Sequence, residues 1–394
     1  MEPISESTLY EEALRRLDGQ PTLEQVLNRI ENGKYPLPFD KGPITLTPQH
    51  RLGAGGEGVT YRSGDDWGAA VKLRPVLSGL PHLPQFGEGA LPVACTYNDG
   101  ILHLEHLPSG TKATILGLGG QEQSAYERAD TERIVSKICS SIPGAVEFRD
   151  GTYILVVEEK GSQLLAGLLT ELIDGKTLGE LMEKGEKTLQ EKLLIIAEVG
   201  DTLKEYQRRS IVHGDVKPGN ILINGKREPT LIDHGISQPL FGDSKNLGYF
   251  CGTPMYAAPE AAAEQFRRKT DFYSLGVIAY ELLAGELPYP AIGVSGWNDN
   301  LHIVRLQGYF CDIEQAEKFC WRVRKSLGER GYAPRLAWSI AGALHGQPAY
   351  RETSLPDVAR EYAALESSTK MGSSLHPEKN TQETVPVKMK PYST

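Results

Sequence analysis

The sequence reads Ile211-Val-His-Gly-Asp-Val-Lys-Pro-Gly-Asn-Ile-Leu-Ile223 in the stretch that decides the fold. Two β-rich runs, at 221–223 and 230–232, flank turn-forming residues, a pattern that predicts a β-hairpin. Antiparallel pairing would place Asn220 beside Asp233, just outside the open end of that hairpin. An amide oxygen beside a carboxylate suits a Mg²⁺ ion that takes its other ligands from water and phosphates. The stretch therefore predicts a metal site.

Two more polar residues lie on the loop that enters the hairpin. Asp215 offers a carboxylate that can orient a hydroxyl group, and Lys217 offers a cation for a phosphate. Together with the two predicted metal ligands, these residues indicate a site that handles phosphate groups.

These residues resemble the catalytic core of the protein kinase family. Its catalytic loop reads H-R-D-x-K-x-x-N and its metal-binding turn reads D-F-G. The matching stretches here begin at His213 and Asp233. The resemblance implies that Asp215 is the catalytic base and that Lys217 steadies the transferred phosphate. It also implies that Asn220 and Asp233 hold magnesium.

A glycine-rich motif, Gly53-Ala-Gly55-Gly-Glu-Gly58, lies upstream. The β-branched pair Val59-Thr60 follows directly and predicts a strand, whereas a dinucleotide-binding fold would begin a helix there. The motif therefore predicts a strand-turn-strand flap over nucleotide phosphates, because glycines let the backbone approach them without a Cβ in the way. By the resemblance, Gly53, Gly55 and Gly58 contact bound ATP.

Lys72 follows the glycine motif at hairpin distance and stands in an apolar, strand-like run. Burying an ammonium group is costly unless an anion pairs with it. Lys72 matches the family's V-A-I-K lysine, which contacts the α- and β-phosphates and pairs with a helix glutamate. Lys112 is the alternative for this role, and Lys72 is preferred because of its distance from the glycine motif.

The expected partner of Lys72 is Glu132, with Glu127 as the second choice. Residues 131–138 have the spacing of an amphipathic helix that would carry Glu132. The residues of this helix that are expected to face the core are Ile134, Val135 and Ile138.

A connection between two lobes is expected after residue 170. By the resemblance, Thr170 guards the back of the nucleotide pocket, and Glu171 and Leu172 contact adenine. The helical run Leu189–Tyr206 leads directly into the catalytic loop. We expect it to be the central helix of the larger lobe.

The downstream motif Gly252-Thr-Pro-Met-Tyr-Ala-Ala-Pro-Glu260 resembles the G-T-x-x-Y-x-A-P-E that closes the activation segment of serine/threonine kinases. This motif favours protein substrates, because phosphotransferases of the aminoglycoside type lack such a peptide-docking segment. The resemblance further implies that the Thr253 hydroxyl contacts Asp215 and Lys217.

Two supporting contacts are implied as well. Asp271, at the start of a helical run, would accept N–H groups of the catalytic loop. Arg351 would form an ion pair with Glu260.

The sequence departs from the family pattern at two positions. Gly214 replaces the arginine that would clamp a phosphate on the activation segment. We therefore expect activity that does not depend on phosphorylation of Ser237, Ser244 or Thr253. His234 replaces the phenylalanine of D-F-G and is expected to fill the same slot between the lobes.

The composition limits the remaining classes of function. The chain has 394 residues, 40% hydrophobic residues and a formal net charge of −9, which is unlike a nucleic-acid binder with a basic patch. The five cysteines lack C-x-x-C spacing, and no apolar run approaches the ~18 residues of a membrane span. We therefore expect no nucleic-acid partner, no membrane span and a cytoplasmic location. Secretion by a leaderless route is an alternative, and the oligomeric state is left open.

The expected fold is α+β, with a small β-rich lobe that has one main helix and a larger helical lobe, as in protein kinases. Capping-box patterns at Thr8 and Glu11 and at Thr22 and Gln25 predict two short helices in an N-terminal extension. The expected units are a helical extension (1–43), a catalytic domain (44–365) and a disordered tail (366–394). The catalytic domain is expected to divide into a small lobe (44–170), with an insertion at about 76–120, and a large lobe (174–365).

The predicted activity is transfer of the γ-phosphate of Mg·ATP to serine or threonine hydroxyls of protein substrates, with autophosphorylation. The expected cofactors are ATP and Mg²⁺. One alternative is a small-molecule kinase of the aminoglycoside or choline type. The other is a pseudokinase scaffold, which we would expect to lack one of the residues that contact phosphate or metal. All four are present, namely Lys72, Asp215, Asn220 and Asp233.

Overall fold

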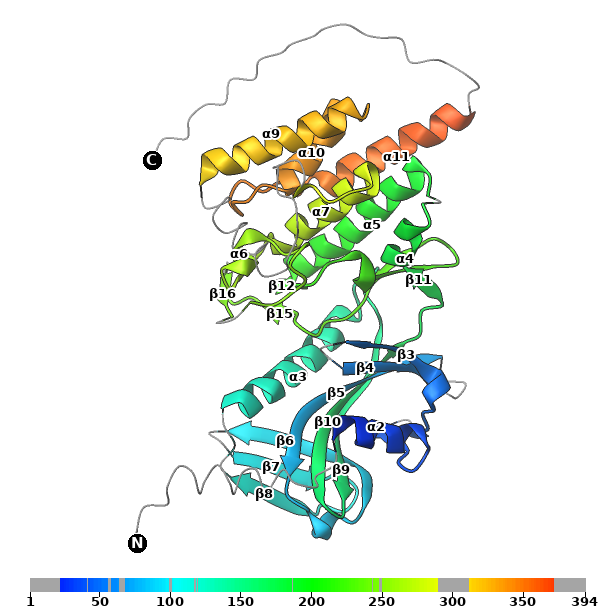
Figure 1. Cartoon of the computed structure of the whole chain (residues 1–394), viewed down its shortest axis with the longest axis vertical. Helices are drawn as coiled ribbons and strands as arrows, with labels where there is room; N and C mark the ends of the chain where they lie inside the picture. Colours follow the sequence, from blue (N-terminus) through cyan, green and yellow to red (C-terminus); the bar gives the residue numbers. More distant parts are fainter. Residues whose placement is uncertain are drawn as a thin grey trace, which may run out of the picture.

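The computed structural model describes residues 22–40, 42–55, 58–63, 68–98, 101–116, 118, 120–185, 187–242, 244–247, 250–289 and 312–371. These residues form two lobes that follow one another along the long axis of the molecule (Figure 1). The first lobe is rich in β-strands and the second is mostly helical. The predicted α+β fold is confirmed.

An eight-stranded antiparallel sheet forms the small lobe. Its strand order is β3-β4-β5-β10-β9-β6-β7-β8. The strands are β3 (Arg51–Gly55), β4 (Gly58–Arg62), β5 (Ala69–Leu80), β6 (Gly89–Asn98), β7 (Ile101–His106), β8 (Lys112–Leu116), β9 (Phe148–Glu158) and β10 (Gly161–Glu171). The described residues of 76–120, expected to be an insertion, include the end of β5 and the three strands that extend the sheet beyond β9.

Helices cover both faces of this sheet. Side chains alternate between the two faces of a strand. Along β9, Ile154 and Val156 pack in the cluster that contains helix α2 (Leu23–Glu31), whereas Leu155 and Val157 pack in the cluster that contains helix α3 (Gly120–Cys139). The sheet therefore lies between two hydrophobic cores.

The N-terminal extension contributes to one of these cores as far as it is described. Helix α2 begins at the predicted capping box, in which the side chains of Thr22 and Gln25 each accept the other's backbone N–H. A hairpin of β1 (Leu37–Phe39) and β2 (Gly42–Ile44) follows and joins α2 in the same hydrophobic cluster. The boundary expected at residue 44 falls inside this hairpin. The helix expected at residues 8–19 lies outside the described residues.

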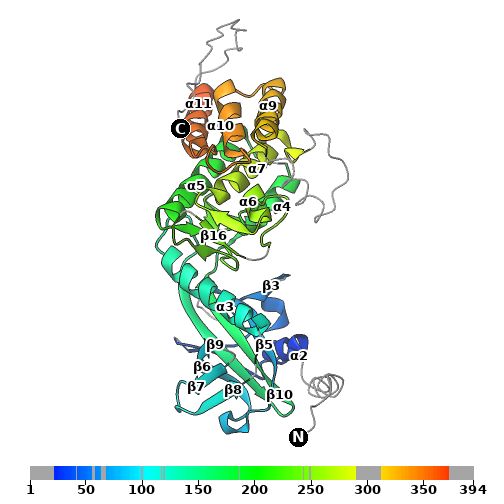
Figure 2. The same ribbon diagram turned by 90° about the vertical axis from the view of Figure 1, so that its left-hand side faces the viewer.

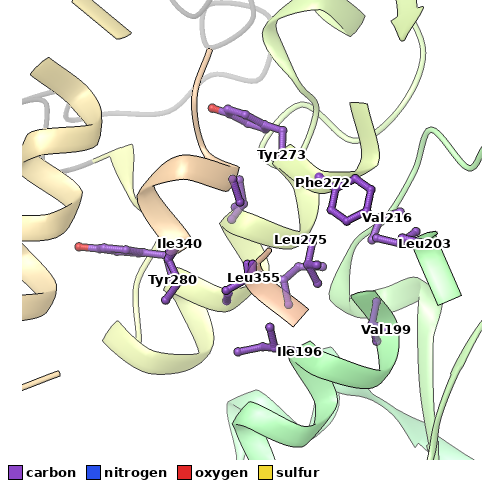
Figure 3. Close-up of a cluster of buried hydrophobic side chains, with 14 of the residues drawn as sticks. Ile196, Val199, Leu203, Val216, Phe272, Tyr273, Leu275, Tyr280, Ile340 and Leu355 are labelled. Carbon is purple, nitrogen blue, oxygen red and sulfur yellow. The ribbon is translucent and has the colours of Figure 1, made fainter. Parts of the chain in front are cut away.

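Helices form most of the large lobe. The longer ones are α5 (Leu189–Arg208), α7 (Thr270–Ala284), α9 (Ile313–Glu329), α10 (Pro334–Ala343) and α11 (Leu355–Met371), and the shorter ones are α4 (Leu178–Glu183) and α6 (Pro259–Ala262). Helix α5 is the central helix predicted at 189–206. Figure 3 shows Val199 and Leu203 of α5 in one cluster with Phe272 of α7 and with Val216, a residue of the loop that precedes the hairpin. Hydrophobic packing therefore holds that loop on the central helices.

Short strands pair within the large lobe. A three-stranded sheet contains β11 (Gly175–Thr177), β13 (Ile221–Asn224) and β14 (Pro229–Leu231), while β12 (Ile211–Val212) pairs with β15 (Gln238–Pro239) and β16 (Ser244–Asn246) pairs with β17 (Gln265–Arg267). Short 3-10 helices lie at Pro48–His50, Pro84–Phe86 and Pro218–Asn220. Among the described helices, none has both the length and the apolar character needed to cross a membrane.

Helix α3 connects the two lobes. Its C-terminal end reaches the large lobe (Figure 2), where the guanidinium of Arg209 donates to the Ile138 carbonyl at 2.7 Å. The helix is longer than the segment predicted at 131–138. Val135 is fully buried as expected, but Ile134 and Ile138 are 43% and 42% exposed, so their predicted burial is wrong. The helix instead turns the buried Glu132 toward the sheet.

Candidate active site

The hairpin predicted at the start of the site is present. Strands β13 and β14 pair antiparallel with Ile221 opposite Leu231. One further backbone hydrogen bond extends the pairing of the two strands, since the Ile232 N–H donates to the Asn220 carbonyl at 2.9 Å. Asp233 therefore follows directly at the open end, next to Asn220. Its φ of 69° lies in the left-handed region that side chains other than glycine rarely adopt, a strain that is common at functional sites.

A cluster of hydrogen bonds surrounds the Asp215 carboxylate. The Thr253 hydroxyl donates to Oδ1 at 2.7 Å, and the Lys217 ammonium lies 2.7 Å from Oδ2 and 2.8 Å from the Thr253 hydroxyl. Both contacts that the sequence predicted for Thr253 are therefore present. The Asn220 amide nitrogen donates to Oδ2 of Asp215 at 3.0 Å and to its carbonyl at 2.9 Å. The amide oxygen of Asn220 is the atom left to face a metal ion.

Lys72 of β5 connects the small lobe to this cluster. Its ammonium lies 2.7 Å from Oε1 of Glu132 on α3 and 2.7 Å from Oδ1 of Asp233. Burial alone would lower the pKa of Lys72, but attraction to Glu132 and Asp233 raises it above its usual value. Burial would raise the pKa of Asp233, but the Lys72 charge and hydrogen bonds lower it well below its usual value. Both groups are therefore charged at neutral pH.

The two alternatives for this pair lie elsewhere. Lys112 is on β8, where its side chain is 70% exposed and pairs with Glu105 at 3.2 Å. The Glu127 carboxylate accepts a hydrogen bond from Gln123 on the surface of α3. The structure thus places Lys72 and Glu132 at the site and leaves Lys112 and Glu127 outside it.

A second cation beside Glu132 was missed by the sequence analysis. Nη1 of Arg74 lies 2.9 Å from Oε2 of Glu132 and 3.1 Å from the carbonyl of Gly235. Strand alternation could have pointed to it, because residues two apart on β5 face the same side of the sheet and Arg74 follows Lys72 by two.

The glycine motif forms the turn between β3 and β4, with Gly55 opposite Gly58. The strand predicted directly after the motif is present, and residues 56 and 57 lie outside the described part of the chain. At Gly58, φ is 144° and a Cβ would lie 2.3 Å from the Leu73 carbonyl oxygen. Glycine is therefore required at this position by the close approach of β4 to β5, in addition to any contact with phosphates.

The connection between the lobes begins at Thr170 and Glu171, the last residues of β10. The backbone N–H groups of Glu171 and Leu172 donate to the carbonyls of Glu147 at 2.9 Å and Gly68 at 3.0 Å. These N–H groups are already paired. The adenine contacts of Glu171 and Leu172 stay a prediction, and their carbonyl oxygens are the backbone atoms that remain for it.

His234 lies between elements of the two lobes. Its Nδ1 is 3.1 Å from the Ser136 hydroxyl of α3, and its Nε2 is 2.6 Å from the Tyr206 hydroxyl of α5. Burial, with the nearby His213 adding to it, lowers the pKa of His234 to about 3. The ring is therefore neutral, and it joins the lobes by hydrogen bonds where the family's phenylalanine would offer only apolar contact.

The two predicted supporting contacts are present. Asp271 accepts the backbone N–H groups of His213 at 2.8 Å and Gly214 at 2.9 Å, which fixes the loop that carries Asp215. Arg351 forms a two-pronged ion pair with Glu260 at 2.6 and 2.9 Å, and both side chains are buried. These contacts hold the activation segment and the catalytic loop on the same helix bundle.

The assembled side chains suit a nucleotide with a divalent cation. Asp233 and Asn220 present the carboxylate and amide oxygens that Mg²⁺ accepts in proteins. Lys72 supplies a cation for phosphate oxygens, and Asp215 supplies a carboxylate for a hydroxyl group. The donor set therefore fits Mg²⁺ with a phosphorylated ligand. Glu132 and Lys217 contact these residues, so the site combines side chains of both lobes.

Comparison with known proteins points to one family. A family model described as the protein kinase domain matches residues 152–331. A putative leucine-rich repeat receptor-like serine/threonine-protein kinase of Arabidopsis thaliana is 34% identical over 251 residues, which cover 57% of this chain and 27% of the relative. Serine/threonine-protein kinase PkaA of Streptomyces coelicolor is 37% identical over 155 residues (37% of this chain, 27% of the relative). PknA of Mycobacterium tuberculosis is 33% identical over 136 residues (34% and 32%).

The matches cover only part of each relative and only part of the site. The chain spans about a third or less of the length of each of these three relatives. The family match begins at residue 152, so it includes Asp215, Lys217, Asn220 and Asp233 but not Lys72. The family match therefore does not include the contacts that Lys72 of the small lobe makes with the site.

Proposed function

We propose that this chain, which matches the protein kinase domain at residues 152–331, is a protein kinase that transfers the γ-phosphate of Mg·ATP to serine or threonine hydroxyls of protein substrates. One observation carries the proposal. Lys72 of the small lobe contacts Asp233 at 2.7 Å, and Asp233 lies beside Asn220, which contacts Asp215 at 3.0 Å. These contacts, with the hairpin that sets Asp233 beside Asn220, bring the lysine expected to bind phosphate close to the expected base.

The reaction depends mainly on positioning and on electrostatics. Asp233 and the amide oxygen of Asn220 would hold the metal, and Lys72 would hold phosphate oxygens. Magnesium, when bound, neutralises charge on the phosphates. Glu132 keeps Lys72 in place, since the two are 2.7 Å apart in a buried setting.

The acceptor side of the site consists of Asp215, Lys217 and Thr253. A carboxylate has about four lone-pair positions, so Asp215 can accept a substrate hydroxyl in addition to its contacts with Thr253 and Lys217. Asp215 orients that hydroxyl and accepts its proton, and Lys217 balances the charge on the phosphate in transfer. The segment 252–260, which contains Thr253, supports a peptide as the substrate, and autophosphorylation is part of the proposal.

The direct test is incubation of purified protein with γ-labelled ATP and Mg²⁺. Parallel reactions contain generic protein substrates, or a panel of aminoglycosides and small amino alcohols, and labelled residues are mapped by mass spectrometry. We expect phosphoserine or phosphothreonine on protein. Label on small molecules alone would replace the proposal with a small-molecule kinase. Nucleotide binding without any transfer would replace it with a scaffold.

The activation segment is held by contacts that involve no phosphate. Strand β16 pairs with β17, and a Cβ on Gly214, where φ is 82°, would lie 2.4 Å from Cζ of Phe266 on β17. The Phe266 ring thus occupies the space that a larger residue at 214 would need. The hydroxyl of Ser237 is buried and donates to the His213 carbonyl at 2.9 Å.

Protein that has been fully dephosphorylated is therefore expected to transfer phosphate at the same initial rate as untreated protein. The reason is that β16 of the segment already pairs with β17 and that Leu247 and Phe250 pack against the hydrophobic cluster of Phe266, so no phosphate clamp is needed. Phosphatase treatment is verified by intact mass, and initial rates are then compared. The expectation fails if the treated protein binds Mg·ATP but is inert, and recovers only on modification of Ser237, Ser244 or Thr253.

A further inference from the structure

The Glu132 carboxylate is shared between two cations. Lys72 contacts Oε1 at 2.7 Å, and Arg74 contacts Oε2 at 2.9 Å. The side chains of Glu132 and Arg74 are only 5% and 8% exposed. A buried carboxylate needs a compensating charge, and here it has one on each oxygen.

Arg74 reaches a second partner in the large lobe. The same Nη1 atom lies 3.1 Å from the carbonyl of Gly235, the last residue of the metal-binding turn Asp233–Gly235. One guanidinium nitrogen therefore joins β5, α3 and the turn that carries Asp233. Lys72 makes a parallel connection from Glu132 to the side chain of Asp233.

The two cations differ in what they do when a nucleotide is bound. Lys72 faces the phosphates, so its ammonium has to share its hydrogen bonds among Glu132, Asp233 and the ligand. Arg74 faces Glu132 and a backbone carbonyl, and neither belongs to the ligand. Its planar guanidinium offers several donors in fixed directions, which suits two acceptors at once.

We propose that Arg74 is a positioning residue, which holds Glu132 and the metal-binding turn in their assembled arrangement while Lys72 engages phosphate. This inference rests on the proposed kinase function. The side-chain alternation of β5 supports it. Val71 and Leu73 pack in the hydrophobic core on the α2 side, which leaves Lys72 and Arg74 on the side of α3.

The test compares Arg74→Met with Arg74→Lys. Methionine keeps an unbranched chain but removes the charge and the donors, whereas lysine keeps a cation for Glu132. We expect Arg74→Met to lower kcat by about tenfold, the scale of a lost coupling within one charged network. KM for the protein substrate should stay unchanged, because Arg74 does not face the acceptor side. Arg74→Lys should restore most of kcat.

A matched control and a double variant complete the kinetic test. Lys112→Met removes a cation from β8 of the same sheet, and it should leave kcat unchanged because Lys112 is exposed. In a Glu132→Gln background, Arg74→Met should cause little further loss, since both changes break the same network. An additive loss, or wild-type kcat in Arg74→Met, would overturn the proposal. If Arg74→Met does not fold, Arg74→Gln takes its place under the same criteria.

Hydrogen exchange provides a readout that needs no catalysis. In Arg74→Met, amide exchange in α3 and in residues 233–235 should rise about tenfold relative to the rest of the protein, and Arg74→Lys should not show this. Unchanged exchange at both places would contradict the positioning role even in an active enzyme. If the wild-type protein transfers no phosphate but the exchange pattern changes as expected, the proposed function fails and the positioning role of Arg74 stands.

Discussion

Replacement Asp215→Asn is expected to abolish phosphate transfer and to leave Mg·ATP binding intact. The Asp215 carboxylate contacts Thr253, Lys217 and Asn220. Asparagine has nearly the same shape, but its neutral amide cannot accept a proton from the substrate hydroxyl. Loss of such a base costs ~10²–10⁴ in rate. Single-turnover rates and calorimetric titration with Mg·ATP measure the two effects separately.

The control for this variant is Asp357→Asn. Asp357 pairs with Lys204 at 2.8 Å on the surface of the large lobe, where its side chain is 66% exposed. The same chemical change at that position should leave transfer unchanged. Phosphate transfer by Asp215→Asn at the wild-type rate would remove Asp215 from the role of base. Loss of nucleotide binding in that variant would show that Asp215 contributes to the binding of Mg·ATP instead.

Replacement Asp233→Asn is expected to weaken binding of Mg·ATP itself. The low pKa of Asp233, which follows from the Lys72 charge and hydrogen bonds outweighing burial, means that the native residue is a carboxylate at neutral pH. Asparagine removes that charge from the metal site and from Lys72, 2.7 Å away. We expect the affinity for Mg·ATP to fall on the order of 100-fold, the upper scale for lost metal-site partners. Calorimetric titration measures it.

Two comparisons test whether the loss of Mg·ATP affinity in Asp233→Asn is due to the metal ion. The affinity for ATP in the absence of Mg²⁺ should differ much less between the variant and the wild type, because Asp233 is expected to contact the nucleotide only by way of the metal ion. Raising the Mg²⁺ concentration should recover part of the lost turnover. If Asp233→Asn binds Mg·ATP as tightly as the wild type, Asp233 is not a metal ligand.

The small lobe shows where sequence patterns were too weak to predict structure. Residues 76–120 contain many prolines and glycines, and the insertion expected there supplies β6, β7 and β8, which extend the main sheet. Pro92 lies inside β6, which pairs with β9 on one side and with β7 on the other, so the Pro and Gly content of the segment did not indicate that it pairs. Helix α3 was predicted with Ile134 and Ile138 inside, but its rotation follows the buried ion pairs of Glu132.

The site itself was more accessible to prediction. Asn220 and Asp233 were placed together because a hairpin turn and strand alternation are local and the register follows from them. The Thr253, Asp271 and Arg351 contacts followed from motifs whose spacing is characteristic of the family. The pairing of the Leu172 N–H with Gly68 had no such signal, because it depends on how two distant loops meet.

Local chemistry in the sequence alone thus determined the hairpin, the glycine turn and the identities of the charged groups at the site. Tertiary structure decided which of those charges share a partner. Lys72 and Arg74 lie on one side of β5 by alternation, but only the packing of α3 against the sheet brings both of them to Glu132. That packing is the sum of many weak contacts spread over the chain, and short patterns do not encode it.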